Sequence, residues 1–450
     1  MNLSAMLHER AERGHPVRIA LIGCGKFATM YLTQALNTRG IQIVGIADLD
    51  PGRAMRQLAT AGWEAERYQA RDAAEALVNG TTWLTDDAAG LIAIDELDVV
   101  VEATGIPAAG ISHCRWAIAA GHHVVMVSVE ADVVAGPLLA TEARAAGVVY
   151  SLAWGDQPAL ICEHVDWART GGFNVVCAGK GTRYHPDYHA LTPDNVWDVL
   201  REYLEIDDPG SINLKMFNSF LDGSKSGIEM SAVCNATGLA PQSEGLNFPP
   251  CSRFELADVC KPAEDGGCLT ARGTTEVVSS LTRDATSVPH HLAMGTYVVI
   301  EAAGDYARQC FREYHMLQDR SGCYAALYRP THMIGMELGV SIASAAIRGE
   351  PTGCPTGFHA DVAATAKRQL KTGETLDGEG GHCVWGRQMP AADSVALGAL
   401  PLGLAADVTM RHDVDAGAIL TYDDVVIDAS DSAVTARRQM ESAFNPSHRT

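Results

Sequence analysis

A glycine-containing turn near the start of the chain has the residue types that hold a pyrophosphate. It directly follows an apolar, strand-like run and opens a stretch with helical periodicity. In such a turn the first glycine permits a tight bend, the second lets the backbone approach the phosphates, and a small third residue lets helix and strand pack closely. The helix N-terminus adds N–H donors and positive potential. Because strand, turn and helix occur in the required order, the motif predicts a dinucleotide site. It consists of Gly23, Cys24, Gly25, Lys26, Phe27 and Ala28.

A carboxylate at the end of the second strand-like run fits the adenosine ribose. Asp48 stands twenty positions after Ala28, where a carboxylate accepts both ribose hydroxyls and repels a 2′-phosphate. Two alternatives stay open: Asp48 caps the next helix, or the neighbouring Asp50 takes the ribose role. Arg53 lies close enough in sequence to tolerate a phosphate. The pattern favours NAD(H), with NADP(H) as the alternative.

A third turn lies at the end of a later buried run. Ala103, Thr104 and Gly105 follow Glu102, and a short polar turn at this place in a Rossmann sheet lines the nicotinamide pocket. An ordinary strand-to-helix turn would have the same sequence, so the residues support both interpretations equally.

Lysines supply the next candidate chemistry. Hydride transfer to a carbonyl needs a proton donor or a cation at the developing alkoxide, and a partly buried lysine serves as either. Lys180 lies between two glycines after a strand-like run, although a solvated turn lysine has the same pattern. Asp222 and Lys225 lie in a second glycine-containing turn, before Glu229 and Asn235. The Lys225–Glu229 spacing also suits a surface ion pair.

Two further segments carry groups that bind or move charge. Arg329 offers bidentate recognition of a carboxylate or phosphate, and His332 is a candidate proton shuttle. Asp156 stands at the expected start of a helix, where capping is the simpler explanation.

The elements that would position these residues alternate along the first third of the chain. Strand-like runs lie at residues 17–23, 41–48, 97–104, 122–127 and 148–153, with helical stretches between them. Such alternation predicts an α/β fold with a parallel sheet covered on both faces. Later, residues 155–172 read as a helix, 173–181 as a strand and 218–221 as strand-like. We predict a Rossmann domain over residues 1–153, an α+β catalytic, substrate and dimerisation domain over 154–355, and a small β-rich module over 356–450.

Composition restricts the class of partner. The 450-residue chain has a formal net charge of −21 and no basic run, which disfavours nucleic acid. No apolar stretch reaches the length of a membrane span, and the N-terminus lacks a secretory pattern. The 12 cysteines form no CxxC pair, and Cys251, Cys260 and Cys268 match no zinc spacing. We therefore expect a cytoplasmic protein with a small-molecule substrate and no metal.

Several stretches together resemble one family, the homoserine-dehydrogenase-like oxidoreductases with a C-terminal SAF-type module. The nearest branch is the DRL type, similar to 1-deoxy-D-xylulose 5-phosphate reductoisomerase. The matching stretches are IGCGKFAT, EATGIP, VVMVSVEADVVAGP, YSLAWGDQP, VCAGKG, FLDGSKSGIEMSAVCNATGL, YRPTHMIGMEL and KTGETLDGEGGHC.

The resemblance implies a nicotinamide cofactor, a homodimer and an active site between the first two domains. It adds Ser128 and Glu130 to the predicted cofactor site. The other segments that it implies around the active site hold Asp156, Lys180, Lys225, Arg329 and His332.

The chain departs from its relatives at three places. Homoserine dehydrogenases carry a lysine where this chain has the Ser128 to Glu130 segment, which argues against homoserine as substrate. DRL reductoisomerases have a second lysine where Thr182 stands here, so we expect a phosphate group of a substrate to be bound differently. Their second strand ends without an acid, in keeping with NADPH, whereas this one ends in Asp48.

These features lead to three hypotheses. The first is an NAD(P)-dependent dehydrogenase or reductase for a small polyol, keto-sugar or sugar acid, with or without phosphate and with or without isomerisation. The second is the NADPH-dependent reductoisomerase of the methylerythritol phosphate pathway. The third is a non-catalytic sensor that binds NAD(H), which the set of lysines and charged partners in the middle of the chain disfavours.

Overall fold

The computed structural model describes residues 2–204 and 212–444, and this part of the chain forms two compact units. The first unit draws on segments within 1–160, 333–356 and 431–440. The second draws on segments within 161–332, 357–430 and 441–450. The division of the sequence into three domains stays a prediction.

A parallel sheet forms the centre of the first unit and has the order β3-β2-β1-β4-β5-β6. All neighbouring strands run parallel, and the order is that of the Rossmann fold. This confirms the predicted α/β class. The strands are β1 (Val17–Ile22), β2 (Ile41–Ala47), β3 (Trp83–Thr85), β4 (Val99–Glu102), β5 (His123–Met126) and β6 (Tyr150–Leu152).

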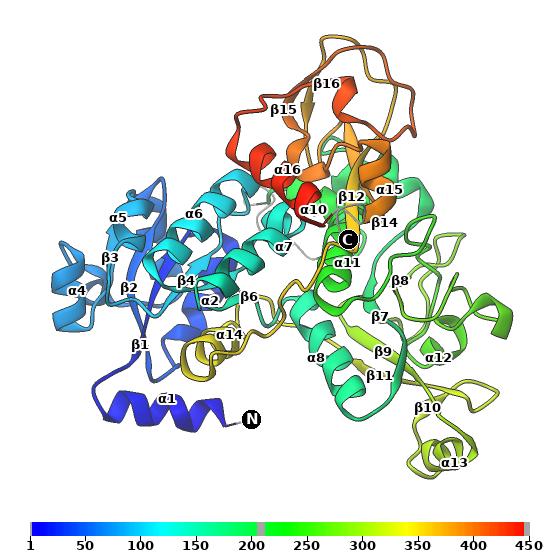
Figure 1. Ribbon diagram of the computed structural model, residues 1–450, viewed down its shortest axis with the longest axis horizontal. Coiled ribbons are helices and arrows are strands. Elements are labelled where there is room, and N and C mark those ends of the chain that lie inside the picture. Colours follow the sequence, from blue (N-terminus) through cyan, green and yellow to red (C-terminus); the bar gives the residue numbers. More distant parts are fainter. Residues whose placement is uncertain (1, 205–211, 445–450) are drawn as a thin grey trace. The chain divides into compact units, whose positions relative to one another are not determined.

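The central strands are apolar because helices cover both of their faces. Every residue of β4 is buried, and β1 is buried except for one intermediate position. The strand-to-helix alternation is visible in the blue and cyan part of Figure 1. The helices are α1 (Leu3–Glu12), α2 (Lys26–Ala35), α3 (Pro51–Thr60), α4 (Ala73–Asn79), α5 (Ala88–Ile92), α6 (Pro107–Ala120) and α7 (Val129–Ala145).

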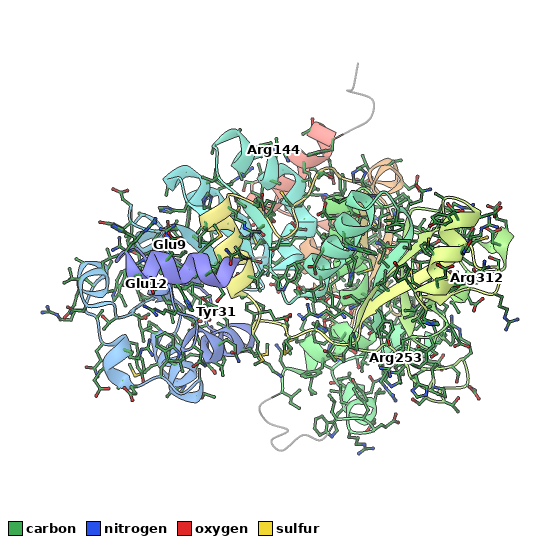
Figure 2. The ribbon with its side chains drawn as sticks, turned by 90° about the horizontal axis from the view of Figure 1, so that it is seen from below. Glu9, Glu12, Tyr31, Arg144, Arg253 and Arg312 are labelled. Atoms are coloured by element: carbon green, nitrogen blue, oxygen red, sulfur yellow. The ribbon has the colours of Figure 1, made fainter. Side chains whose placement is uncertain are left out.

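Late parts of the chain complete this unit. Leu338 and Ile342, at helix α14 (Gly339–Ala343), belong to the same apolar core as Val17 of β1. Tyr31 of α2, labelled in Figure 2, is buried in that core. Helix α16 (Ser432–Phe444) accepts a 2.9 Å hydrogen bond from Arg115 on its Gln439.

The second unit is built on a mixed sheet with the order β10-β11-β9-β7-β8. Strand β7 runs antiparallel to β9 and parallel to β8. One face of the sheet packs against α8 and α11, and the other carries Cys177 and Tyr297 in a separate core with α12. The elements are α8 (Gln157–Thr170), β7 (Asn174–Thr182), α9 (Val196–Leu200), α10 (Leu214–Leu221), α11 (Ser224–Thr237), α12 (Leu256–Val259), β8 (Thr274–Ser279), β9 (Thr296–Glu301), α13 (Asp305–Glu313), β10 (Leu317–Gln318) and β11 (Tyr324–Arg329).

The C-terminal part of this unit is rich in strands, as the sequence predicted. Strands β12 and β14 pair antiparallel, and β15 pairs antiparallel with both β13 and β16. Gly227 of α11 lies so close to this part that a Cβ there would be 3.1 Å from the Gly386 carbonyl. The elements are β12 (Ala360–Ala366), β13 (Thr375–Asp377), β14 (Val384–Pro390), α15 (Ala391–Leu397), β15 (Ala406–Met410) and β16 (Val425–Val426).

One secondary-structure prediction was wrong. Residues 218–221 read as strand-like, but they form the end of helix α10. Asn213 caps this helix by accepting a 3.1 Å hydrogen bond from the Met216 amide. Its apolar residues recur at helical spacing and pack with α9. A window of four residues is too short to reveal this helical period.

Candidate active site

The glycine turn after β1 has a cradle open on one side. Gly23 has φ +89°, and a Cβ there would lie 2.8 Å from the Ala103 carbonyl oxygen, so only glycine fits. Gly25 is the N-cap of α2, and apart from its own chain neighbours no described residue has an atom within 4 Å of a Cβ placed on it. The turn is therefore packed against the protein at one glycine and open for a ligand at the other.

The remaining motif residues divide between the core and the open side. Cys24 and Ala28 are fully buried, which lets α2 lie close to β1. Phe27 packs against the same core, whereas Lys26 is exposed at the first position of α2. Burial raises the pKa of the Cys24 thiol to about 12, so the side chain is a neutral packing group.

Asp48 lies beside this turn, directly after β2. Its Oδ2 accepts a 2.8 Å hydrogen bond from the Cys24 amide, and its Oδ1 accepts one of 2.9 Å from the Asp50 amide. Arg53 donates to both oxygens, at 2.8 and 2.6 Å. Although burial alone would raise it, the pKa of Asp48 lies below its ordinary value because these donors favour the carboxylate.

Together these groups fit a dinucleotide. The open Gly25 and the N-terminus of α2 offer amide donors to a pyrophosphate, and the ionised Asp48, which is paired with Arg53, lies next to them. Gly25 leaves room for a ligand, and Asp48 stands beside the turn where the motif predicts an acid. The assignment of individual residues to the cofactor stays a prediction.

The predicted nicotinamide turn is organised by a buried acid. The Thr104 hydroxyl donates to Oε1 of Glu102 at 2.5 Å, and the Thr104 amide donates to the same oxygen at 3.2 Å. Glu102 is fully buried, and its Oε2 has no hydrogen-bond partner among the described residues. Ala103 is half-buried, whereas Gly105 is exposed with φ +70°.

Ser128 and Asp156 are helix-start residues. The buried Ser128 is the N-cap of α7 and accepts a 3.4 Å hydrogen bond from the Ala131 amide, while Glu130 is partly exposed in the first turn. Asp156 is also buried and accepts a 2.8 Å bond from the Gln157 amide where α8 begins. The place of Asp156 directly before α8 is that of a cap residue, and its catalytic role stays a prediction.

The second unit holds Lys180 in a buried ion pair. Lys180 on β7 is 4% exposed and Glu229 on α11 is 3% exposed, and the Lys180 ammonium donates to Glu229 Oε2. The turn around Lys180 is in fact the interior of a strand, so the solvated-turn alternative does not describe it.

Strand register places Lys180 in a row with two other polar residues. Lys180 pairs with Thr296 of β9, which in turn pairs with Arg329 of β11. Directly paired residues project from the same face of a sheet. Lys180, Thr296 and Arg329 therefore form a polar row at one end of the face that packs against α8 and α11.

Sequence reasoning missed His164, which joins this row from α8. Its Nε2 lies 3.1 Å from the Thr296 hydroxyl oxygen. Burial, with a contribution from the charge of Arg329, lowers the pKa of His164 to about 4, so the ring is neutral near pH 7. A signal was present: His164 lies three residues after Ile161 and four before Ala168, on the buried stripe of the helix.

Two other predicted catalytic residues, His332 and Lys225, lie on segments next to residues that are already described. His332, just beyond β11, bonds the Met294 carbonyl through Nδ1 at 2.8 Å, two residues before Thr296. Lys225 is half-buried in the first turn of α11, one helical turn before Glu229.

Asp222 has a different set of contacts. It is fully buried, accepts a 2.9 Å bond from the Ser224 amide and forms a 2.7 Å ion pair with Lys367. These contacts suit a residue that positions the start of α11, and its predicted catalytic role stays untested.

No group of three or more metal-ligating side chains with suitable geometry occurs in residues 2–204 and 212–444. In the same part of the chain, no helix combines the length and hydrophobicity that a membrane span requires.

Comparison with known families agrees with this geometry. Residues 23–152 match the description "Homoserine dehydrogenase, NAD binding domain", and residues 155–338 match "Oxidoreductase DRL, catalytic domain". These two stretches therefore fall in the class of NAD-binding and oxidoreductase catalytic domains. Within that class, the two matches confirm the resemblance to the DRL-type, homoserine-dehydrogenase-like oxidoreductases.

Solved structures with a similar fold are remote. Biliverdin reductase from Synechocystis sp. PCC 6803 shares 20% identity over 38% of this chain and 48% of its own, with TM-score 0.26. Dihydrodipicolinate reductase from Paenisporosarcina sp. TG-14 shares 12% over 74% and 95%, with TM-score 0.34. Scyllo-inositol dehydrogenase from Lactobacillus casei shares 11% over 63% and 73%, with TM-score 0.33. The chain spans about half the length of the biliverdin reductase. Comparison with curated proteins found no match.

Proposed function

We propose that the chain catalyses NAD(H)-linked oxidation or reduction of a small hydroxylated substrate, such as a polyol, keto-sugar or sugar acid. The observation that carries this proposal is the polar row of Lys180, Thr296 and Arg329, with His164 bonded to its centre. A row of this kind on a sheet face offers several donors to one small oxygenated molecule.

Lys180 is the group that we assign to the reacting oxygen. The bound nicotinamide supplies or accepts the hydride. The ammonium of Lys180, held by Glu229 in a nearly dry environment, donates a proton or a hydrogen bond to the developing alkoxide. In the opposite direction the amine form of Lys180 takes the proton from the alcohol, and Lys225 would stabilise the same oxygen.

Arg329, His164 and His332 would orient the rest of the substrate. Arg329 is half-buried at the end of the polar row, and a guanidinium is suited to a carboxylate or to adjacent hydroxyls. His164 is neutral near pH 7 and hydrogen-bonds without adding charge. This combination favours a substrate with one anionic or strongly polar end.

The surroundings of Thr182 support a substrate without a phosphate. Thr182 stands where the reductoisomerases have a lysine, and the next cation, Arg183, donates to Glu202 at 3.0 Å and stacks over the Tyr203 ring at 4.6 Å. Arg183 is thus already bound to other groups. Because Arg183 is bound in this way and the lysine is absent, we keep the reductoisomerase, whose substrate carries a phosphate, as the rival hypothesis.

An assay with paired cofactors tests the proposal. Thermal-shift screening of polyols, keto-sugars, sugar acids and their phosphates, with NADH present, identifies ligands that bind the native state. Hits and 1-deoxy-D-xylulose 5-phosphate are then assayed with each cofactor. NADPH-driven turnover of the phosphate would overturn our proposal in favour of the reductoisomerase, and binding of NADH without any turnover would favour the sensor.

The resemblance also suggests the assembly and setting of the protein. We propose a cytoplasmic homodimer whose strand-rich C-terminal segment is an SAF-like module that supports packing or substrate contact. Light scattering on the purified protein tests the homodimer, and a monomeric mass would contradict it.

A further inference from the structure

The carboxylate at the predicted ribose site has all of its acceptor positions filled. Oδ2 of Asp48 accepts from the Cys24 amide and from Arg53, and Oδ1 accepts from the Asp50 amide and from Arg53. A carboxylate offers about four lone-pair positions. These four hydrogen bonds, all within the described residues, therefore leave no acceptor for two ribose hydroxyls.

The donors around Asp48 differ in whether they can move. The Cys24 amide belongs to the packed glycine turn and the Asp50 amide to the start of α3, so both are fixed by the backbone. Arg53 reaches Asp48 by a flexible side chain that is 48% exposed, whereas the Asp48 side chain is 1% exposed. Withdrawal of Arg53 would free one position on each oxygen, as many as the 2′- and 3′-hydroxyls require.

We propose that Arg53 is a movable guanidinium that determines nucleotide selectivity. In the free protein it covers Asp48, and it must leave Asp48 before the adenosine ribose can bind there. Once displaced, it stands beside the 2′ position as a cation and a bidentate donor suited to a phosphate. Arg53 therefore weakens the binding of NAD(H) and permits that of NADP(H). The chain then uses both nucleotides, and the difference between its affinities for them is modest.

The inference rests on the proposed use of Asp48 and deepens it, because an uncovered aspartate at this position would repel a 2′-phosphate. With Arg53 attached, the Asp48 site carries no net charge from this pair. With Arg53 moved outward, the attraction between Arg53 and a 2′-phosphate opposes the repulsion between that phosphate and the Asp48 carboxylate.

Arg56 provides a matched control on the same helix. It lies one turn along α3, its side chain is 68% exposed, and it pairs with Asp50 at 3.0 Å. Arg56→Ala removes the same charge from the same helix without uncovering Asp48. This variant also tests the alternative in which Asp50 binds the ribose.

The experiment measures nucleotide binding without turnover. NADH and NADPH are titrated by their fluorescence into the wild type, Arg53→Ala, Arg53→Gln and Arg56→Ala, with no substrate present. We expect both Arg53 variants to bind NADH more tightly and NADPH more weakly, so that the ratio of the two Kd values changes by about tenfold or more, as loss of one charge-assisted contact implies. Arg56→Ala should leave the ratio unchanged.

The outcomes separate this inference from the proposed function. If the wild type binds both nucleotides and the Arg53 variants keep its ratio, Arg53 does not set selectivity, although the cofactor proposal stands. If Arg56→Ala changes the ratio of the two Kd values as strongly as Arg53→Ala, the change comes from the overall charge of helix α3, and the inference is overturned. If the wild type binds neither nucleotide, both proposals fail. Arg53→Gln keeps the side-chain length and serves if the alanine variant does not fold.

Discussion

Replacement of Lys180 by methionine should damage both stability and catalysis, and the two effects can be separated. The Lys180 and Glu229 side chains are 5% and 4% exposed. Removing one member of such a buried pair leaves an uncompensated charge and costs about 3–5 kcal/mol of unfolding free energy. A typical domain has about 5–15 kcal/mol in total, so Lys180→Met should remain folded at low temperature with a much reduced melting temperature.

The double variant Lys180→Met/Glu229→Gln isolates the chemical role. Since no charge is then left unpaired, most of the lost stability should return. Activity should not return, because the proton donor is absent. Loss of a general acid typically costs about a hundredfold to ten-thousandfold in rate, and we expect the double variant to fall in that range.

Three measurements on each variant give a complete comparison. Urea unfolding reports stability, NADH fluorescence reports whether the nucleotide unit is intact, and steady-state turnover of a screened substrate reports catalysis. Lys261→Met is the matched control, because Lys261 also forms a buried ion pair, with Asp319 at 2.8 Å, but lies outside the polar row. It should lose stability to a similar extent while its folded fraction keeps the wild-type kcat.

Two results would refute the reasoning about Lys180. Wild-type turnover by the double variant would show that Lys180 is only structural. An equal loss of kcat in Lys261→Met would show that turnover depends on stability of the unit and not on the proton donor.

Further predictions concern the nucleotide turn, the buried acid of α7 and the polar row. Gly25→Val should keep the melting temperature but weaken NADH binding by at least about tenfold, because its side chain would occupy the open cradle. Gly23→Ala should instead lower the melting temperature, because its Cβ would meet a backbone oxygen at φ +89°. Burial raises the pKa of Asp132 from 3.8 to about 7, so the folded state holds a proton that the unfolded state releases. Wild-type stability should therefore fall as pH rises from about 4 to about 7, by an amount on the order of 4 kcal/mol at most, and Asp132→Asn should flatten this dependence. His164→Ala should lower kcat/KM by about tenfold through loss of one hydrogen bond, and Arg329→Gln should mainly raise KM.

Each of these predictions has a contradicting result. Unchanged NADH affinity in Gly25→Val would place the pyrophosphate elsewhere, and a stable Gly23→Ala would show that the turn can rearrange. Equal pH dependence in the wild type and Asp132→Asn would mean that Asp132 does not titrate in this range. Unaltered kinetics in His164→Ala or Arg329→Gln would remove that residue from the proposed substrate site.

The nucleotide-binding half was predictable because its signals are local. The strand, the glycine turn and Ala28 are consecutive in sequence, and Asp48 follows at a distance fixed by one helix and one strand. The short strand β3 was missed, because three residues show too little periodicity to be recognised.

The proposed substrate site in the second unit was only partly predictable because its signals are non-local. Lys180 and Arg329 were selected one by one, from glycine neighbours and side-chain type. Their alignment through Thr296 depends on the register of β7, β9 and β11, which no local pattern encodes. His164 was overlooked for the same reason, since a buried histidine on a helix becomes informative only when the strand opposite it is known.

The arrangement of the first unit has a consequence for how this protein is made. Its apolar core includes Leu338 and Ile342 together with Val17, and its compact region extends to residues 431–440. During translation the core of this unit therefore receives its last apolar partners only after residues 338–343 have been synthesised. Until then the apolar side chains that pack against them lack part of their cover, and such transiently exposed surface favours aggregation.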